Sequence, residues 1–129
     1  MVRVAINGYG RIGRVAHRII LEKFSDQIEI VAINAGSSTD MKGWMYLLQY
    51  DTMYGTLQHH SLFVQSPEEV TIKTSLETIG GLVIDDRTIP FYSEKDPSKL
   101  PWRELNVDVV IESTGAFTTP EKIQPHLDS

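Results

Sequence analysis

The first fourteen residues, MVRVAINGYGRIGR (residues 1–14), combine an apolar run with three closely spaced glycines. Residues 2–6 are mostly β-branched and apolar, which is typical of a buried strand. Gly8, Gly10 and Gly13 follow directly, in the pattern Gly-x-Gly-x-x-Gly. This pattern is not specific by itself, so its meaning depends on the segments that surround it.

The segments after the glycines complete a β-α-β unit. Apolar residues recur at helical spacing between residues 11 and 23, which predicts a helix with one apolar face. Residues 28–33 form a second β-branched run and predict a second strand. Strand, helix and strand thus fit within residues 2–33, the length of one parallel β-α-β unit.

Short strand-like pieces follow a second predicted helix. That helix is expected to begin at Thr39 or Asp40 and to end near Tyr50. The strand-like pieces are separated by turn sequences and cover residues 60–65, 69–74, 81–84 and 88–92. Because residues 85–87 are typical of a hairpin connection, we expect an antiparallel insertion here.

Parallel winding is expected to resume near the end of the sequence. Residues 107–111 predict a buried strand, and Thr118 or Thr119 is expected to begin a helix. The predicted fold class is therefore α/β, a Rossmann-type, mostly parallel sheet with an antiparallel β insertion and an incomplete second half. We expect residues 1–129 to form one truncated domain of this type.

Composition argues against several classes of function. The 129 residues carry a formal charge of −5, which gives no reason to expect a nucleic-acid or membrane partner. The absence of cysteine excludes disulfides and thiolate metal sites within these residues. No signal peptide or membrane span is evident, so a cytoplasmic protein is expected. His59 and His60 lack a third ligand, and we expect two surface histidines and no metal site.

The β-α-β context gives the glycine loop a specific interpretation. Gly8 permits a tight turn, Gly10 lets the backbone approach a pyrophosphate, and Gly13 lets the helix pack closely on the strand. Amides at Arg11 and Ile12 would face the phosphates. The alternatives are a plain strand-to-helix turn and S-adenosylmethionine, which carries no phosphate to match the basic residues of the loop. A dinucleotide is therefore the favoured ligand.

The residues after the second strand bear on which dinucleotide binds. NAD sites usually carry Asp or Glu there, about 20 residues beyond the glycines, to accept hydrogen bonds from the ribose. Here the strand ends with Asn34 and Ala35, and no acidic residue occurs before Asp40. Without a carboxylate a 2′-phosphate is not repelled, and Ser37 and Ser38 could donate to it. NADP is therefore permitted, and NAD bound without an acid stays open.

The chain as a whole resembles the N-terminal cofactor-binding segment of the glyceraldehyde-3-phosphate dehydrogenase family. The blocks that carry the resemblance are INGYGRIGR (6–14), VAIN (31–34), LLQYDTMYG (47–55), EKDPSKLPW (94–102) and ESTGAFTTPEK (112–122). Ala35 departs from the family pattern, in which an acid is usual, and Tyr54 stands where histidine is common. Erythrose-4-phosphate dehydrogenases share most of these blocks and remain an alternative.

The resemblance implies a set of cofactor-binding residues for NAD or NADP. These are Asn7, Gly8, Gly10, Arg11, Ile12, Gly13, Asn34, Ala35, Lys95, Ser113, Thr114, Gly115 and Phe117. The loop residues would cradle the dinucleotide, and Lys95 matches a basic position near the adenine. The turn that begins at Ser113 matches the segment beside the nicotinamide ribose.

The resemblance also implies an oxidoreductase of glycolysis, which oxidises a phosphorylated aldehyde to an acyl phosphate with transfer of a hydride to the nicotinamide. The family's Ser-x-x-Cys-Thr-Thr-Asn block and catalytic histidine are not found in residues 1–129. We therefore expect no catalytic residue or catalytic domain here, and an inactive chain that needs the missing domain as partner. The family forms homotetramers. The alternative is a free-standing dinucleotide-binding or interaction module without catalysis.

Overall fold

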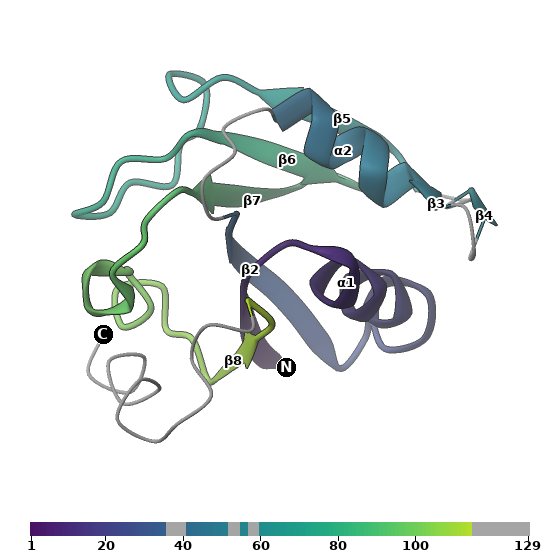
Figure 1. The fold of residues 1–129 in the computed structure, drawn as a ribbon, viewed down its shortest axis with the longest axis horizontal. Coiled ribbons are helices and arrows are strands. Elements are labelled where there is room, and N and C mark those ends of the chain that lie inside the picture. The colour runs from purple at the N-terminus through teal and green to yellow at the C-terminus, as the bar shows by residue number, and fades with distance from the viewer. Residues whose placement is uncertain (36–40, 52–54, 57–59, 115–129) are drawn as a thin grey trace.

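A mixed sheet of six strands, drawn with its two helices in Figure 1, organises the structure. The computed structural model describes residues 1–35, 41–51, 55–56 and 60–114. The elements of this sheet and its helices are β1 (Val2–Asn7), α1 (Arg11–Lys23), β2 (Ile28–Asn34), α2 (Met41–Gln49), β5 (Leu62–Gln65), β6 (Gly80–Ile84), β7 (Arg87–Tyr92) and β8 (Val109–Glu112). Two short strands, β3 (Tyr50–Asp51) and β4 (Gly55–Thr56), pair separately, and a 3-10 turn covers Pro97–Lys99.

The strand order, β5-β6-β7-β2-β1-β8, confirms the Rossmann-type prediction. Strands β7, β2, β1 and β8 are parallel neighbours, the arrangement of the first four strands of a doubly wound sheet. The antiparallel insertion is confirmed as well, because β6 pairs antiparallel with both β5 and β7. Asp85 and Asp86 connect β6 to β7 with φ values of 49° and 71°, the positive values of a two-residue hairpin turn.

Residues 69–74, which the sequence predicts as a strand, form a turn and irregular chain instead. The Glu69 amide donates to the Ser66 carbonyl (3.0 Å), and the Glu69 carboxylate accepts from the Ser66 amide (3.0 Å). These local bonds satisfy backbone groups that a strand would have paired with a neighbour. The hydrogen-bonding pattern at the turn thus overrides the β-branched composition of the segment.

The last described strand is also displaced from its predicted position, residues 107–111. Val107 closes a turn by donating its amide to the Trp102 carbonyl (3.0 Å), so β8 begins only at Val109. The end of the second predicted helix is confirmed, because α2 ends at Gln49. Its expected caps, Thr39 and Asp40, and the helix expected from residue 118 or 119 lie outside the described residues.

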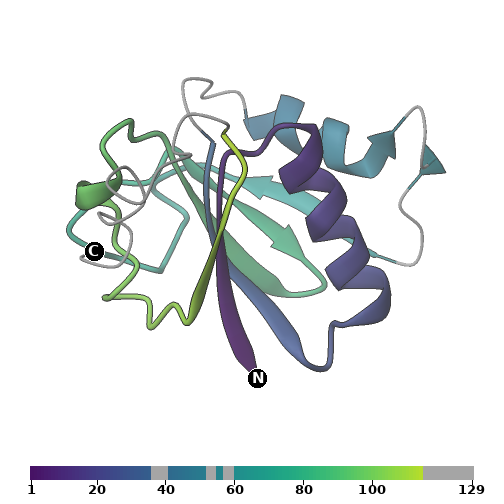
Figure 2. The ribbon, with the colours of Figure 1, turned by 60° about the horizontal axis from the view of Figure 1, so that its bottom comes forward.

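Two apolar cores cover the two faces of the sheet. Along β1 the side chains alternate, so that Val4 and Ile6 face one core and Ala5 faces the other. The first core includes Ile20 of α1 and Leu48 of α2. The second core is completed by the chain between β7 and β8, through Leu100, Trp102 and Leu105. Figure 2 shows the two helices on one side of the sheet and this connecting chain on the other.

Tyr9, the residue between the first two glycines, anchors the glycine loop in the first core. Its side chain is 1% exposed, and its ring lies edge-on to Phe91 at a centroid distance of 5.3 Å. Its hydroxyl lies 2.7 Å from Nδ1 of His17, which is itself fully buried in α1. The loop therefore turns the Tyr9 side chain inward, whereas Gly10 beside it stays exposed.

The buried His17 should make stability depend on pH. Burial, and to a lesser extent the nearby His60, lowers the pKa of His17 to about 3, whereas the unfolded chain binds this proton near pH ~6.5. Because the unfolded state binds more protons below that value, the free energy of unfolding should fall by up to about 1.4 kcal/mol per pH unit on acidification.

Urea unfolding between about pH 7 and about pH 5 measures this slope before most carboxylates titrate. His17→Asn is the matched variant, because its side-chain oxygen can take the place of Nδ1 as acceptor for the Tyr9 hydroxyl and it carries no titrating group. The variant should lose the part of the slope that His17 contributes. Equal slopes in the two proteins would contradict the assignment.

Candidate dinucleotide-binding site

The glycine loop lies at the switch point of the sheet. From β1 the chain passes through α1 to β2 on one side, whereas the other neighbour of β1 is β8. Open α/β sheets bind ligands outside the carboxyl ends of the strands at such a point. The Gly8 amide donates to the Asn34 carbonyl (2.9 Å), and the Ser113 hydroxyl donates to the Gly8 carbonyl (2.6 Å). The loop is thus held from both neighbouring strand ends.

Two of the loop glycines are required by packing. Gly8 has φ +97°, and a Cβ there would come within 2.8 Å of both the amide and Cγ2 of Thr114. A Cβ on Gly13 would collide with the Gly8 carbonyl oxygen and lie 3.1 Å from Cγ2 of Ile6. These two positions accept glycine alone because α1, β1 and the end of β8 meet there.

Gly10 has no such structural requirement. A Cβ built on Gly10 meets nothing within 4 Å, so it would project into open space in front of α1. Gly10 is the N-cap residue of α1 and has an extended backbone. Because it has no side chain, it makes no side-chain hydrogen bond to the first turn of the helix. The loop therefore leaves a cradle at this glycine that a side chain would begin to fill, which is what close approach of a pyrophosphate needs.

The first turn of α1 is open to an anion. It contains no acidic residue, and Arg11 and Ile12 are both exposed, Ile12 to 72%. The first amides of a helix have no intrahelical acceptor, and the helix dipole adds partial positive charge at this end. The residues at the switch point therefore fit the phosphates of a dinucleotide.

A line of hydrogen-bonded groups, here called the amide line, joins the strand ends beneath the loop, and it consists of the buried side-chain amides of Asn34 and Asn7, the half-buried Glu112 carboxylate and the backbone of Glu94. Asn34 donates through Nδ2 to Oδ1 of Asn7 (2.7 Å) and to the Glu94 carbonyl (2.7 Å), and its Oδ1 accepts from the Glu94 amide (2.9 Å). Asn7 donates through Nδ2 to the Glu112 carboxylate (2.7 Å). Glu112 also accepts from the amide of Thr114 (3.0 Å). Asn7 and Asn34 are 2% and 3% exposed, so both side chains act inside the protein.

The structure gathers most of the predicted site residues at one edge of the sheet. Asn7 and the glycines follow β1, Asn34 and Ala35 end β2, and Ser113 and Thr114 follow β8. Lys95 is exposed and directly follows Glu94 of the amide line. Gly115 and Phe117 lie outside the described residues.

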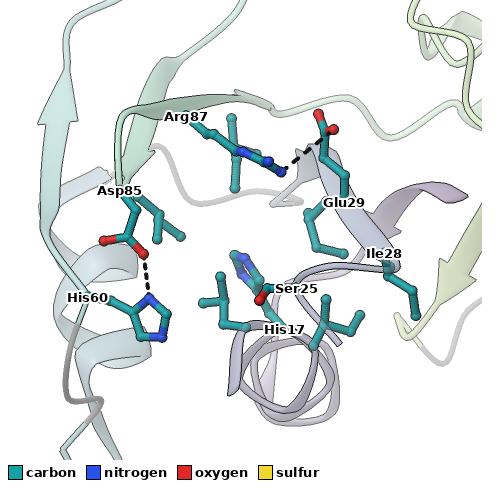
Figure 3. A pocket seen from close by; sticks show the side chains of 12 residues that line it. His17, Ser25, Ile28, Glu29, His60, Asp85 and Arg87 are labelled. Carbon is teal, nitrogen blue, oxygen red and sulfur yellow. Dashed lines mark hydrogen bonds and ion pairs between the residues drawn. The ribbon is translucent and has the colours of Figure 1, made fainter. Parts of the chain in front are cut away.

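Sequence reasoning missed Tyr9, Glu94 and Glu112, which support the site from inside. The only available signal was their position, because Tyr9 lies within the glycine pattern and both glutamates follow or end predicted strands. His60, expected at the surface, is only partly exposed, since its side chain is 16% exposed and its Nδ1 lies 2.5 Å from the Asp85 carboxylate (Figure 3). His59 lies outside the described residues.

Among the described residues, no three histidine, aspartate or glutamate side chains cluster in a way that would hold a metal ion. Within the same part of the chain, no helix has the length and apolar character to cross a membrane.

The sheet order, the β-α-β unit and the glycine loop at the switch point define a Rossmann-type dinucleotide-binding domain. A family model described as glyceraldehyde 3-phosphate dehydrogenase, NAD binding domain, matches residues 2–120. The chain therefore belongs to this family of NAD-binding domains.

Relatives with that enzyme's name match almost the whole chain. Glyceraldehyde-3-phosphate dehydrogenase of Thermotoga maritima is 46% identical over 100% of this chain and 34% of its own length. The enzyme of Chlamydia muridarum is 41% identical over 99% of the chain and 33% of its own length. Glyceraldehyde-3-phosphate dehydrogenase 2 of Streptomyces avermitilis is 43% identical over 98% of the chain and 32% of its own length. The chain thus spans about a third of the length of the curated relatives it matches.

Replacing Asn34 by alanine should destabilise the fold. Asn34→Ala leaves Oδ1 of Asn7 and both backbone groups of Glu94 without their present partner, next to the site. We expect the free energy of unfolding to fall by about 2 to 4 kcal/mol, measured by urea denaturation. Gln27→Ala, which removes an exposed amide just before the same strand, is the matched control and should change it by less than about 0.5 kcal/mol. Similar small losses in both variants would show that the amide line does not stabilise the sheet.

Proposed function

We propose that residues 1–129 are the NAD-binding part of a phosphorylating glyceraldehyde-3-phosphate dehydrogenase. The observation that carries this proposal is the open space at Gly10, in front of a helix N-terminus that no side chain caps, at the switch point of the sheet. Membership in the NAD-binding domain family and the names of the relatives support the choice of cofactor and reaction.

Within this proposal the phosphates lie against the first turn of α1. The amides of Arg11 and Ile12 donate to the pyrophosphate, and Gly10 allows its approach. Gly8 and Gly13 set the shape of the loop, as their packing against the end of β8 and against each other supports.

The remaining proposed contacts follow the carboxyl edge of the sheet. Ser113 and Thr114 contact the nicotinamide ribose, and Lys95 contacts the adenine. Gly115 and Phe117, which lie outside the described residues, belong to the same proposed set through the family resemblance. Ala35 faces the adenosine ribose at the end of β2. Asn7 and Asn34 contribute by position, because their side-chain amides are bonded inside the protein.

The bound nicotinamide would supply the acceptor for the hydride that leaves the aldehyde. Residues 1–129 hold and orient the dinucleotide. They contain no cysteine, so the thiolate that attacks the aldehyde in this family would come from elsewhere in the full-length enzyme. Our proposal therefore includes a catalytic domain as partner, a cytoplasmic location and a homotetrameric full-length protein, and it expects no dehydrogenase activity from residues 1–129 alone.

Replacing Gly10 by alanine tests the proposed cradle. The fold has room for this methyl group, so stability should change by less than about 0.5 kcal/mol. The same methyl group lies in the proposed path of the pyrophosphate, so calorimetric titration should show NAD binding weakened by at least about tenfold, or about 1.4 kcal/mol.

Gly8→Ala is the contrasting variant, because its φ of +97° and the contact with Thr114 oppose any side chain. It should lower the free energy of unfolding by at least about 1 kcal/mol. Unchanged NAD affinity in a folded Gly10→Ala protein would contradict the proposed position of the pyrophosphate.

Replacing Ala35 by aspartate tests whether this position selects between NAD and NADP. A carboxylate at this position would repel the 2′-phosphate of NADP and accept hydrogen bonds from the ribose hydroxyls of NAD. We expect the ratio of the two dissociation constants to shift toward NAD by about tenfold or more. Ala35→Asn is the control of equal size, which matters because Ala35 is only 7% exposed. Equal shifts in both variants, or none in either, would show that the charge at this position does not select the cofactor.

A further inference from the structure

The glycine loop begins with an asparagine followed by a glycine, Asn7 and Gly8, and this pair has a reactivity that the proposed NAD site does not use. The backbone nitrogen of the residue after an asparagine can attack the side-chain amide, and glycine hinders this attack least because it has no Cβ. The chain contains three asparagines, and Asn7 alone precedes glycine. Asn34 precedes alanine, and Asn106 precedes valine, whose β-branched side chain hinders the attack.

The reaction needs no reagent besides water. The Gly8 nitrogen gives up its hydrogen and forms a bond to Cγ of Asn7. The bond from Cγ to Nδ2 breaks, and Nδ2 takes up a hydrogen and leaves as ammonia. Water then opens the resulting succinimide ring at either carbonyl, which gives aspartate or its iso form, in which the backbone runs through the former side chain. The net change replaces an amide by a carboxylate, with uptake of water and loss of ammonia.

Hydrogen bonds hold both reacting groups in the folded chain. The Gly8 amide, which would have to lose its hydrogen, donates to the Asn34 carbonyl (2.9 Å). Oδ1 of Asn7 accepts from Nδ2 of Asn34 (2.7 Å), and Nδ2 of Asn7 donates to the Glu112 carboxylate (2.7 Å). These two partners lie on the strands at opposite sides of β1. The side chain therefore cannot rearrange around the Gly8 nitrogen while both bonds are intact.

Burial adds to this protection. Asn7 is 2% exposed, and Gly8 is buried as well. The reaction needs a base at the Gly8 amide and water at the ring, so it needs the loop to open. A hydrogen bond within a protein contributes a factor of about two to ten to such an equilibrium. The three bonds together therefore predict a reaction that is roughly 10- to 1,000-fold slower in the folded chain than in an unfolded one.

The product does not fit where Asn7 lies. Aspartate has an oxygen in place of Nδ2, and this oxygen would face the Glu112 carboxylate across the present distance of 2.7 Å. Two carboxylates so close repel each other, and at neutral pH neither has a hydrogen to donate. The iso form lengthens the backbone before Gly8, which shifts the loop against the Asn34 carbonyl. Either product therefore breaks the amide line that holds the loop.

We propose that Asn7 is a deamidation site that the fold protects, and that its reaction in molecules with an open loop permanently prevents the glycine loop from regaining its shape. Opening of the loop is reversible, whereas the loss of ammonia is not. The extent of the reaction thus records how long the loop has been open. No dinucleotide takes part, so this proposal and the proposed function can fail separately.

Reaction rates at Asn7 test the protection in the purified protein. The folded chain, the chain unfolded in guanidinium chloride and a synthetic peptide of residues 4–11 are incubated at the same mildly alkaline pH. Samples are digested by a protease that works in acid, where ring closure is slow, and mass spectrometry separates the amide, aspartate and iso forms. We expect similar rates in the unfolded chain and the peptide, and a rate lower by about tenfold or more in the folded chain. Asn106 is the control within the same chain, and it should react more slowly than Asn7 when the chain is unfolded.

Two substitutions test the effect assigned to the product. Asn7→Asp reproduces the aspartate form and should lower the midpoint of unfolding by guanidinium chloride. Adding Glu112→Gln should restore about half or more of this loss, because the glutamine amide can donate to the new carboxylate while its oxygen accepts from the Thr114 amide. Glu112→Gln alone is the matched control, and it should also lower the midpoint, because it sets two amide donors against each other. If Asn7→Asp does not fold, folding of the double variant gives the same readout.

Four results would overturn the proposal. Protection of less than about tenfold in the folded chain would contradict the role of the three hydrogen bonds. Absence of the reaction at Asn7 in the unfolded chain would remove the site. An Asn7→Asp protein as stable as the parent, or a double variant no more stable than Asn7→Asp, would contradict the repulsion from Glu112.

Discussion

The hydrogen bond between the buried amides of Asn34 and Asn7 (2.7 Å) joins the carboxyl ends of the two central parallel strands. Parallel pairing brings Asn7 level with Asn34 on one side and with Glu112 on the other. One line of side chains can therefore cross three strands and reach the backbone of Glu94 beyond the end of β7. Such a line has to be satisfied along its length, because unpaired amides at this depth would be costly.

The glycine loop depends on this constraint because its attachment points are the same strand ends. The Gly8 amide is bonded to the Asn34 carbonyl, and the Ser113 side chain is bonded to the Gly8 carbonyl. With both strand ends fixed, Tyr9 packs inward and Gly10 is left on the open side, in front of α1. The pattern Gly-x-Gly-x-x-Gly thus combines two glycines that packing requires with one that the fold leaves free for a ligand.

Local sequence patterns predicted the parts of the fold that local chemistry determines. The strand, helix and strand predicted within residues 2–33 are confirmed, because β-branched runs and a helical apolar period are properties of neighbouring residues. The hairpin at Asp85 and Asp86 was correct because both residues tolerate positive φ values. The strand predicted for residues 69–74 is wrong. The Glu69 carboxylate accepts a hydrogen bond from the Ser66 amide, and this turn competes with the strand that the composition would permit.

The support beneath the site could not be predicted from the sequence in the same way. Asn7 and Glu112 are 105 residues apart, and only the sheet topology brings them together. His60 and Asp85 are 25 residues apart in the sequence, and likewise only the fold brings them together. The glycine pattern located the site, whereas these pairings between distant residues became evident only from the structure.

The most direct test of the account is to map the backbone amides that respond to NAD in the purified protein by NMR. The account predicts the largest shifts at Gly10, Arg11, Ile12 and Gly13, with smaller shifts at Ser113 and Thr114 and little change at the amino ends of β2 and β7. Saturable NAD binding that leaves the first turn of α1 unshifted would contradict the claim that this turn holds the dinucleotide phosphates.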